Sequence, residues 1–171
     1  MSKTSLDTNL RVLPLRERPE FIPELQAWFE AEWPGYYGPG GPGDARRDLL
    51  AYAQPDAAAL PLGLLALRRD ADGLSEHPCG FAAIKTEPFA PCPDLGPWAG
   101  AALVPPALRR QGIGLLLLQA LVREARAQAR HPALFCATAT SDSLMLRAGW
   151  RLRERVMHQG QSLGVYEMAL G

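Results

Sequence analysis

A glycine-containing turn joins an apolar segment of small residues to the longest helical pattern in the chain. The apolar segment spans residues 98–104, the helical pattern spans residues 113–129, and the turn contains Gly112 and Gly114. Apolar residues repeat at helical spacing after the turn, whereas the segment before it is a short continuous apolar run. A buried strand that leads directly into a long helix is typical of sheets covered by helices. This junction therefore predicts a fold that mixes strands and helices.

The rest of the chain shows the same alternation. Asp44 is the expected N-cap of a helix, whereas the proline- and glycine-rich segment 36–43 is predicted to be irregular. The predicted order is β-α-α-β-β-β-α-β-α-β-β, an α/β fold with a mixed sheet and helices on its faces. We expect strands at residues 10–15, 60–67, 79–85, 98–104, 134–138, 151–157 and 165–170, and helices at residues 19–33, 44–52, 113–129 and 141–147.

Length and composition exclude several classes of protein. The chain has 171 residues, of which 47% are hydrophobic and 21% charged, and its formal net charge is +0. This length predicts one domain over residues 1–171 with a core at about 10–170. The zero net charge provides no general attraction to nucleic acid or anionic membranes. We expect neither partner, and we expect a cytoplasmic protein because its 3 cysteines form no C-x-x-C pair.

The turn before the longest helix has the chemistry of an anion site. The first N–H groups of a helix lack partners within the helix, and the helix dipole places positive charge there. Gly112 and Gly114 leave room for a ligand to approach the backbone, and Arg109 and Arg110 add charge. These features predict a phosphate or pyrophosphate site, although glycines used only for packing are the alternative. A dinucleotide fingerprint does not fit, because Leu117 occupies its third glycine position.

The same run resembles the signature [Q/R]-x-x-G-x-[G/A] of the GNAT superfamily of acetyl-CoA-dependent N-acetyltransferases. It reads Arg109-Arg110-Gln111-Gly112-Ile113-Gly114, after the lead-in Val104-Pro105-Pro106. A second landmark of the family, a short helix that ends in glycine and an aromatic residue, is present at residues 144–150. The resemblance covers about residues 10–170. It implies a GNAT-like acyl-CoA N-acyltransferase fold and direct attack by a primary amine on acetyl-CoA in a ternary complex.

The resemblance also implies which residues hold acetyl-CoA. The backbone N–H groups from Arg110 to Gly114 would bind the diphosphate, and the pantetheine arm would pair with the strand around Ala102 and Val104. The implied coenzyme-binding residues are Ala102, Val104, Arg109, Arg110, Gln111, Gly112, Ile113 and Gly114. No metal site is expected, because His77 and Cys79 have no second pair of ligands.

The sequence departs from the family at the residue that protonates the leaving thiolate. Many members have a tyrosine four residues before the glycine of the second landmark, and that position is Met145 here. Ser141, Ser143 or a water would substitute, or the thiolate would leave without assistance. A catalytically weak or inert acyl-CoA-binding module is therefore the alternative to an enzyme.

The general base is not marked by a motif. The strand at residues 98–104 contains no carboxylate, and the candidate bases are Glu32, Glu87 and Asp94, each acting through a water. Each of these side chains could equally be a solvated surface acid.

An aromatic loop after the first helix is the expected acceptor side. In the family this segment often lines the acceptor site, and here it contains Trp33, Tyr36 and Tyr37. Aromatic faces hold cations or flat amines, although packing of the loop onto the sheet would use the same side chains. A small-molecule amine or a peptide is the expected acceptor. The final hairpin offers an edge strand, so a monomer or a homodimer is expected.

Overall fold

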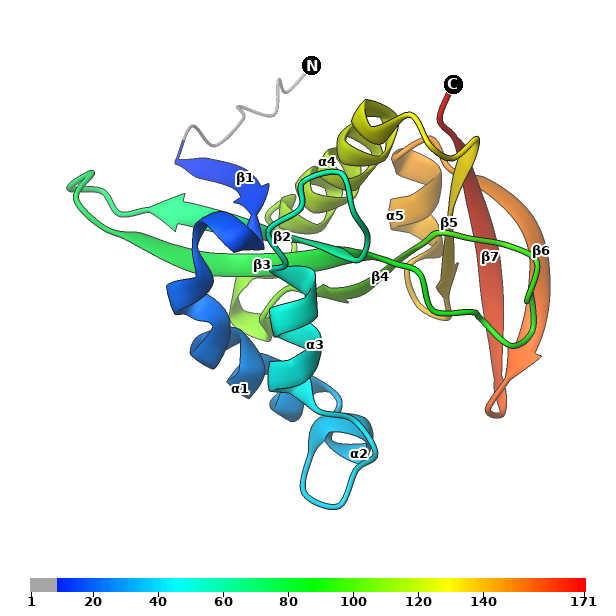
Figure 1. Cartoon of the computed structure of the whole chain (residues 1–171), viewed down its shortest axis with the longest axis horizontal. Coiled ribbons are helices and arrows are strands. Elements are labelled where there is room, and N and C mark those ends of the chain that lie inside the picture. The colour runs from blue at the N-terminus through cyan, green and yellow to red at the C-terminus, as the bar shows by residue number, and fades with distance from the viewer. Residues whose placement is uncertain (1–8) are drawn as a thin grey trace.

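The computed structural model describes residues 9–171, which form a mixed sheet with helices on both faces (Figure 1). The order of elements along the chain matches the predicted fold class, apart from one additional short helix. The strands are β1 (Leu10–Pro14), β2 (Leu62–Arg69), β3 (Glu76–Lys85), β4 (Trp98–Leu103), β5 (Ala133–Thr138), β6 (Arg151–His158) and β7 (Gln161–Ala169). The helices are α1 (Ile22–Glu32), α2 (Pro34–Tyr37), α3 (Ala45–Tyr52), α4 (Ile113–Gln128) and α5 (Asp142–Arg147), with three short 3-10 turns.

The sheet has the strand order β1-β2-β3-β4-β5-β7-β6. Neighbouring strands are antiparallel except β4 and β5, which are parallel and are joined in register at one pair, Trp98 with Phe135. By contrast, β5 and β7 pair over six consecutive positions. The sheet is therefore least continuous between β4, its central strand, and β5.

A β-bulge interrupts β4 beside this discontinuity. Ala83 lies opposite Gly100 and Phe81 lies opposite Leu103, so Ala101 and Ala102 together face a single residue of β3. Ala101 has a φ of 49°, a left-handed conformation that non-glycine residues rarely adopt. Bulges redirect the backbone and are common next to active sites.

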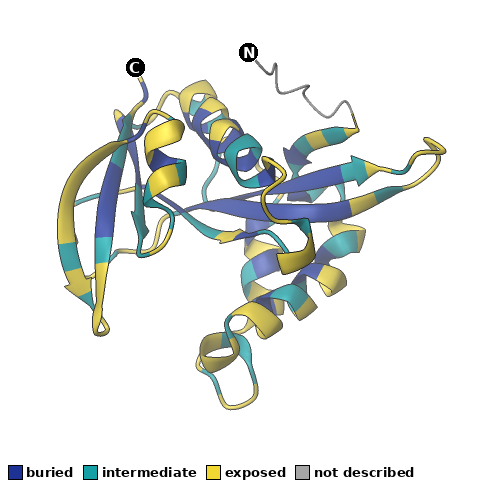
Figure 2. Cartoon of the chain, turned by 180° about the vertical axis from the view of Figure 1, so that it is seen from behind, coloured by how far each residue is buried: buried dark blue, intermediate teal, exposed yellow. Residues whose placement is uncertain are grey.

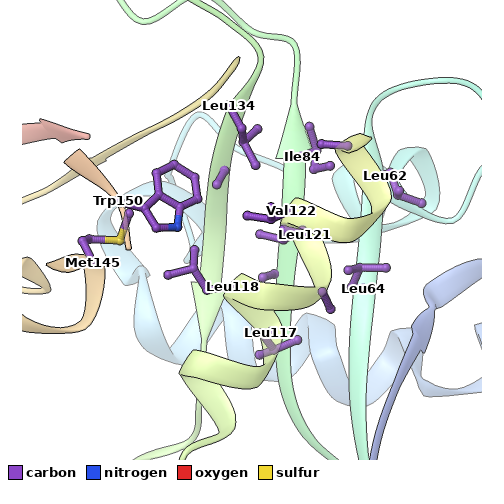
Figure 3. Close-up of a cluster of buried hydrophobic side chains, with 14 of the residues drawn as sticks. Leu62, Leu64, Ile84, Leu117, Leu118, Leu121, Val122, Leu134, Met145 and Trp150 are labelled. Atoms are coloured by element: carbon purple, nitrogen blue, oxygen red, sulfur yellow. The ribbon is translucent and has the colours of Figure 1, made fainter. Parts of the chain in front are cut away.

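Two helical layers cover the sheet. Helix α4 and Met145 of α5 pack on one face, and α1 and α3 pack on the other, around Phe29 and Phe81. Figure 2 shows the buried strands between these layers. Figure 3 shows how α4 contributes Leu117, Leu118, Leu121 and Val122 to a core that includes Leu62, Leu64 and Ile84 of β2 and β3, Leu134 of β5, Met145 and Trp150.

The predicted caps are present. The Asp44 side chain accepts a hydrogen bond of 2.9 Å from the backbone N–H of Arg47 at the start of α3. Gly149 has a φ of 85° after α5, and the N–H of Trp150 donates to the carbonyl of Met145 at 3.0 Å. This arrangement closes the last turn of α5 and needs a left-handed residue at Gly149.

Segment 36–43 was predicted to be irregular, and this was wrong for its first two residues. Tyr36 and Tyr37 belong to the one-turn helix α2. Pro34 occupies its first turn, where a missing N–H costs nothing, and the N–H of Gly38 donates to the Pro34 carbonyl at 2.9 Å. The glycines and prolines after Tyr37 end helix α2 at that residue, but they do not prevent the helix from forming.

Two strands begin three or more residues earlier than predicted. Strand β7 starts at Gln161 because Gln159 and Gly160 both have positive φ and form a two-residue turn. Strand β3 starts at Glu76, three residues before the apolar run. Polar residues at these ends pair through their backbone, so apolar patterning does not detect them.

No helix within residues 9–171 is both long enough and apolar enough to span a membrane.

Candidate active site

A cavity of about 860 Å³ lies where the sheet is least continuous. Its walls come from β4, β5, the end of α1, the first turns of α4, and α5. Two residues of the final hairpin, Gln161 and Leu163, complete the wall. The cavity therefore exists only because segments from both halves of the chain converge on it.

The start of α4 faces this cavity with unpaired backbone donors. Gly112 is the N-cap, and no side chain of the described residues caps the helix. Gly112 has a φ of 82°, and a Cβ placed on it would meet no atom within 4 Å. The left-handed backbone conformation, and not a lack of space, therefore favours glycine at position 112. The open space beside the first N–H groups, together with the helix dipole, suits an anion.

Four charged side chains line the cavity, and three of them are arginines. Arg109 donates through Nε to the carbonyl of Val104 at 2.8 Å, and its Nη2 lies 3.2 and 3.3 Å from the two carboxylate oxygens of Glu32. Arg110 and Arg147 form no hydrogen bond or ion pair with any residue of the described chain. The walls therefore carry an excess of positive charge.

The sequence-predicted coenzyme residues largely converge on this cavity. The residues that line it are Ala102, Val104, Arg109, Arg110, Gly112, Ile113 and Gly114. Gln111 belongs to the same loop but is exposed outside the cavity wall. Residues 109–114 thus lie together at the start of α4, and five of these six residues line the cavity.

The three candidate bases lie in different places. Glu32, the last residue of α1, lines the cavity. Glu87 and Asp94 lie in the loop between β3 and β4, outside the cavity wall, and Glu87 is 68% exposed and paired with Lys85 at 2.9 Å. Cys92 of that loop packs against Phe135 and Val165, away from the start of α4. Only Glu32 among the candidate bases can meet a ligand in the cavity.

Helix α5 presents Ser141 and Met145 to the cavity, but Ser143 points elsewhere and is exposed. Met145 is 2% exposed and packs in the main core, so its thioether is a wall and not a proton donor. The start of α5 is held by Asp142, which accepts a hydrogen bond from the buried Tyr166 hydroxyl and lies 3.2 Å from Arg155. The hydrogen bond from Tyr166 is the main reason that the pKa of Asp142 is lowered.

Of the three predicted acceptor aromatics, Trp33 alone lines the cavity. Its ring packs edge-to-face on Phe29 with centroids 5.1 Å apart. The Tyr37 hydroxyl donates to Asp48 at 2.9 Å, and its pKa is raised by burial and then by this hydrogen bond. Tyr36 is 49% exposed and packs edge-on against Tyr37. The two tyrosines therefore hold the loop together beside the wall that Trp33 forms.

Several cavity residues were not identified from the sequence. Arg147 stood inside the second family landmark, but nothing in its local pattern showed that it lines the cavity. Cys136 of β5 packs against the main core and also lines the cavity. Burial raises the pKa of Cys136 to about 12, so it remains a thiol near neutral pH. The hairpin residues Gln161 and Leu163 carried no signal, because only the sheet order brings β7 beside β5.

Comparisons with known proteins agree with this fold. The model of the acetyltransferase (GNAT) family matches residues 22–148. Among solved structures, the putative acetyltransferase yncA from Salmonella typhimurium, with its cofactor acetyl-CoA, is 14% identical with a TM-score of 0.70, covering 96% of this chain and 95% of that one. An N-acetyltransferase from Staphylococcus aureus is 18% identical with a TM-score of 0.70, covering 96% and 100%.

A third structure of the same fold is an aminoglycoside 6'-N-acetyltransferase complexed with coenzyme A. It is 12% identical with a TM-score of 0.65, covering 94% of this chain and 97% of that one. No match was found among curated proteins. At these identities the solved structures show a shared fold.

Proposed function

The chain belongs to the GNAT family of acetyltransferases, and from this we propose that it transfers an acetyl group from acetyl-CoA to a primary amine in a ternary complex. One observation carries the proposal. The uncapped start of α4 and two unpaired arginines, Arg110 and Arg147, face the same 860 Å³ cavity. This arrangement has the charge and the donors that the phosphates of coenzyme A require.

The backbone of β4 is suited to orient the arm of acetyl-CoA. The bulge leaves Ala101 and Ala102 outside the regular ladder with β3, and both residues line the cavity. Their backbone groups are therefore available to the amides of the pantetheine arm, in the manner of an added strand. Bound acetyl-CoA supplies a thioester carbonyl for amine attack, with a thiolate as the leaving group. A backbone N–H of the bulge is the proposed donor to the oxygen that gains negative charge.

Glu32 is the proposed proton acceptor. The attacking amine must lose a proton, and Glu32 is the only carboxylate among the cavity-lining residues of the described chain. A water between the carboxylate and the amine allows this transfer without direct contact. No acid is proposed at Met145. The thiolate leaves unassisted or receives its proton through Ser141, which also lines the cavity.

The proposed acceptor is a small-molecule or peptide primary amine that approaches beside Trp33. A tryptophan face next to a carboxylate favours a cationic group, and both Trp33 and Glu32 line the cavity.

An acyl-CoA-binding module with weak turnover is the second candidate function, and the observation that favours it is the buried Met145 at the position of the family's proton donor.

Thermal unfolding with acetyl-CoA tests the coenzyme site first. At about 100 times the dissociation constant the ligand stabilises the fold by roughly 2.7 kcal/mol, which raises the melting temperature by about 5–10 °C for a chain of this size. Release of free thiol in the presence of a panel of primary amines then tests transfer. A thermal shift without thiol release from any amine supports the binding module. The absence of a shift contradicts both candidate functions.

A further inference from the structure

A second cavity, of about 410 Å³, lies beside the middle and the C-terminal half of α4. Its lining includes Gln119, Val122, Arg123, Arg126, Trp150 and Met168. The residues from α4 share one face of that helix, since they are spaced by three and four residues. No residue lines both this second cavity and the larger one. Arg123 lies nine residues beyond Gly114, which is about 14 Å along the helix axis. The second cavity is therefore separate from the proposed coenzyme site.

The polar side chains of the second cavity are mostly hydrogen-bond donors. Arg123, Arg126 and Trp150 carry N–H groups and no acceptor. The amide of Gln119 supplies the one side-chain oxygen, and no carboxylate of the described residues lines the cavity. A ligand that matches these walls must bring acceptors and negative charge.

Two of these donors have no partner within the described chain. Arg123 is exposed and forms no hydrogen bond or ion pair with residues 9–171. Trp150 is only 3% exposed, and its indole Nε1 is buried without a hydrogen-bond partner among the same residues. Native proteins rarely leave a buried donor unpaired, because its lost hydrogen bond to water is then not replaced. Nη2 of Arg126, by contrast, donates to the carbonyl of Ala169 at 3.3 Å, which holds this guanidinium beside the end of β7.

We propose that the second cavity binds a small organic anion. Arg123 and Arg126 hold its charged oxygens at the rim, and the N–H of Trp150 donates to a further oxygen. Val122 and Met168 provide an apolar wall for the body of the ligand. A guanidinium binds the oxygens of a carboxylate or of a phosphate equally well, and the volume lies within the range of small-molecule sites. The inference goes beyond acetyl transfer and does not depend on it, because no proposed coenzyme residue takes part.

The indole N–H signals of the full chain, in a proton–nitrogen correlation NMR spectrum, test the site. Trp150 reports on the second cavity and Trp33 on the larger one. Trp98 is an internal control, since its Nε1 already donates to the Leu95 carbonyl at 3.0 Å. Trp150→Phe identifies its signal by the loss of a peak, and sequential backbone assignment identifies it if that variant is unstable.

Benzoate is the first probe, phenyl phosphate carries the other oxyanion, and benzamide keeps the ring of benzoate without its charge. We expect the Trp150 signal to shift and saturate with one or both anions, while the Trp98 signal stays in place. The anion that binds more tightly identifies the oxyanion that the cavity prefers. Benzamide should leave the Trp150 signal unchanged.

Substitution of the rim arginine separates charge recognition from general packing. Arg123→Gln should weaken binding of the preferred anion about tenfold, the size of one lost charge-assisted hydrogen bond. Arg123→Lys should retain part of the affinity because the charge is kept. Arg130→Gln is the matched control, since Arg130 is also exposed and lines neither cavity. It should bind the anion as the wild type does.

Four results overturn the inference. One is an unshifted Trp150 signal with both anions, and another is an equal response to benzamide, which would make the cavity apolar in its preference. Wild-type affinity in Arg123→Gln would show that this arginine is only a solvated charge. A shift of the Trp33 signal alone would place the probe in the larger cavity. All four leave the proposed acetyl transfer untouched, because that function is tested by acetyl-CoA and thiol release.

Discussion

Arg109 and Glu32 are 77 residues apart in sequence, and their ion pair, at 3.2 Å, joins the end of α1 to the loop before α4. The same guanidinium donates to the carbonyl of Val104. One side chain therefore connects the proposed acceptor side, the strand that precedes the signature loop, and the loop itself. Both partners remain partly exposed, so the pair contributes to arrangement more than to stability.

Substituting Glu32 should separate a catalytic role from a structural one. If Glu32 accepts the proton, Glu32→Gln lowers kcat by about 100-fold, a usual effect of losing a general base. The melting temperature should change little, because an exposed ion pair contributes at most about 1 kcal/mol. The control is Glu24→Gln, an exposed carboxylate on the same helix but outside the cavity. Unchanged kcat in Glu32→Gln would reassign the proton transfer to water.

A glutamate at Gly112 should abolish coenzyme binding. The substitution places a negative charge beside the uncapped N–H groups of α4 and forces a side chain into a left-handed conformation, at a cost of about 1–2 kcal/mol. Gly73→Glu is a close match, because Gly73 has a φ of 72° and equally open space around it in the turn between β2 and β3. The two variants should lose similar stability in urea denaturation. Retained coenzyme affinity in Gly112→Glu would remove the helix start from the site.

Met145 should be replaceable by leucine without loss of turnover. The two side chains have similar volume, so the core cost should stay below about 1.5 kcal/mol. Neither side chain can protonate a thiolate, and kcat for a reactive amine should therefore match the wild type in a thiol-release assay. The control Met145→Ala should instead lose stability by about 2–5 kcal/mol, because it opens a cavity in the core beside Trp150. A large fall in kcat for Met145→Leu would show that the sulfur has a role.

Acid should weaken the fold through Glu76. Hydrogen bonds from Arg11 and then Arg18 lower the pKa of this carboxyl from 4.5 to about 2. A carboxyl whose pKa is lowered by folding stabilises the fold at pH values above its pKa in the unfolded chain. That contribution is lost as the pH falls from about 4.5 to about 2. The urea midpoint of the wild type should decrease across this range. In Glu76→Gln the decrease should be shallower, and identical profiles would contradict the assignment.

Much of the fold was predictable because its signals are local. Asp44 caps α3 through a backbone N–H three residues away, and Gly149 ends α5 through bonds within the same turn. The signature loop is likewise local, since a strand end, a glycine with positive φ and a helix start follow one another directly. The short helix α2 and the polar ends of β3 and β7 were missed, because their stability comes from backbone pairing and not from apolar spacing.

The sequence by itself determined the element order, the helix start and the family signature, since each depends on residues that are neighbours in the chain. Only the tertiary structure decided which side chains share the cavity. It brought Glu32 to the wall of the cavity and left Glu87 and Asp94 in a loop elsewhere, and it placed Arg147 on the same cavity as Arg110. The physical reason is that the strand order brings distant segments together, and the discontinuity between β4 and β5 opens the space that they surround.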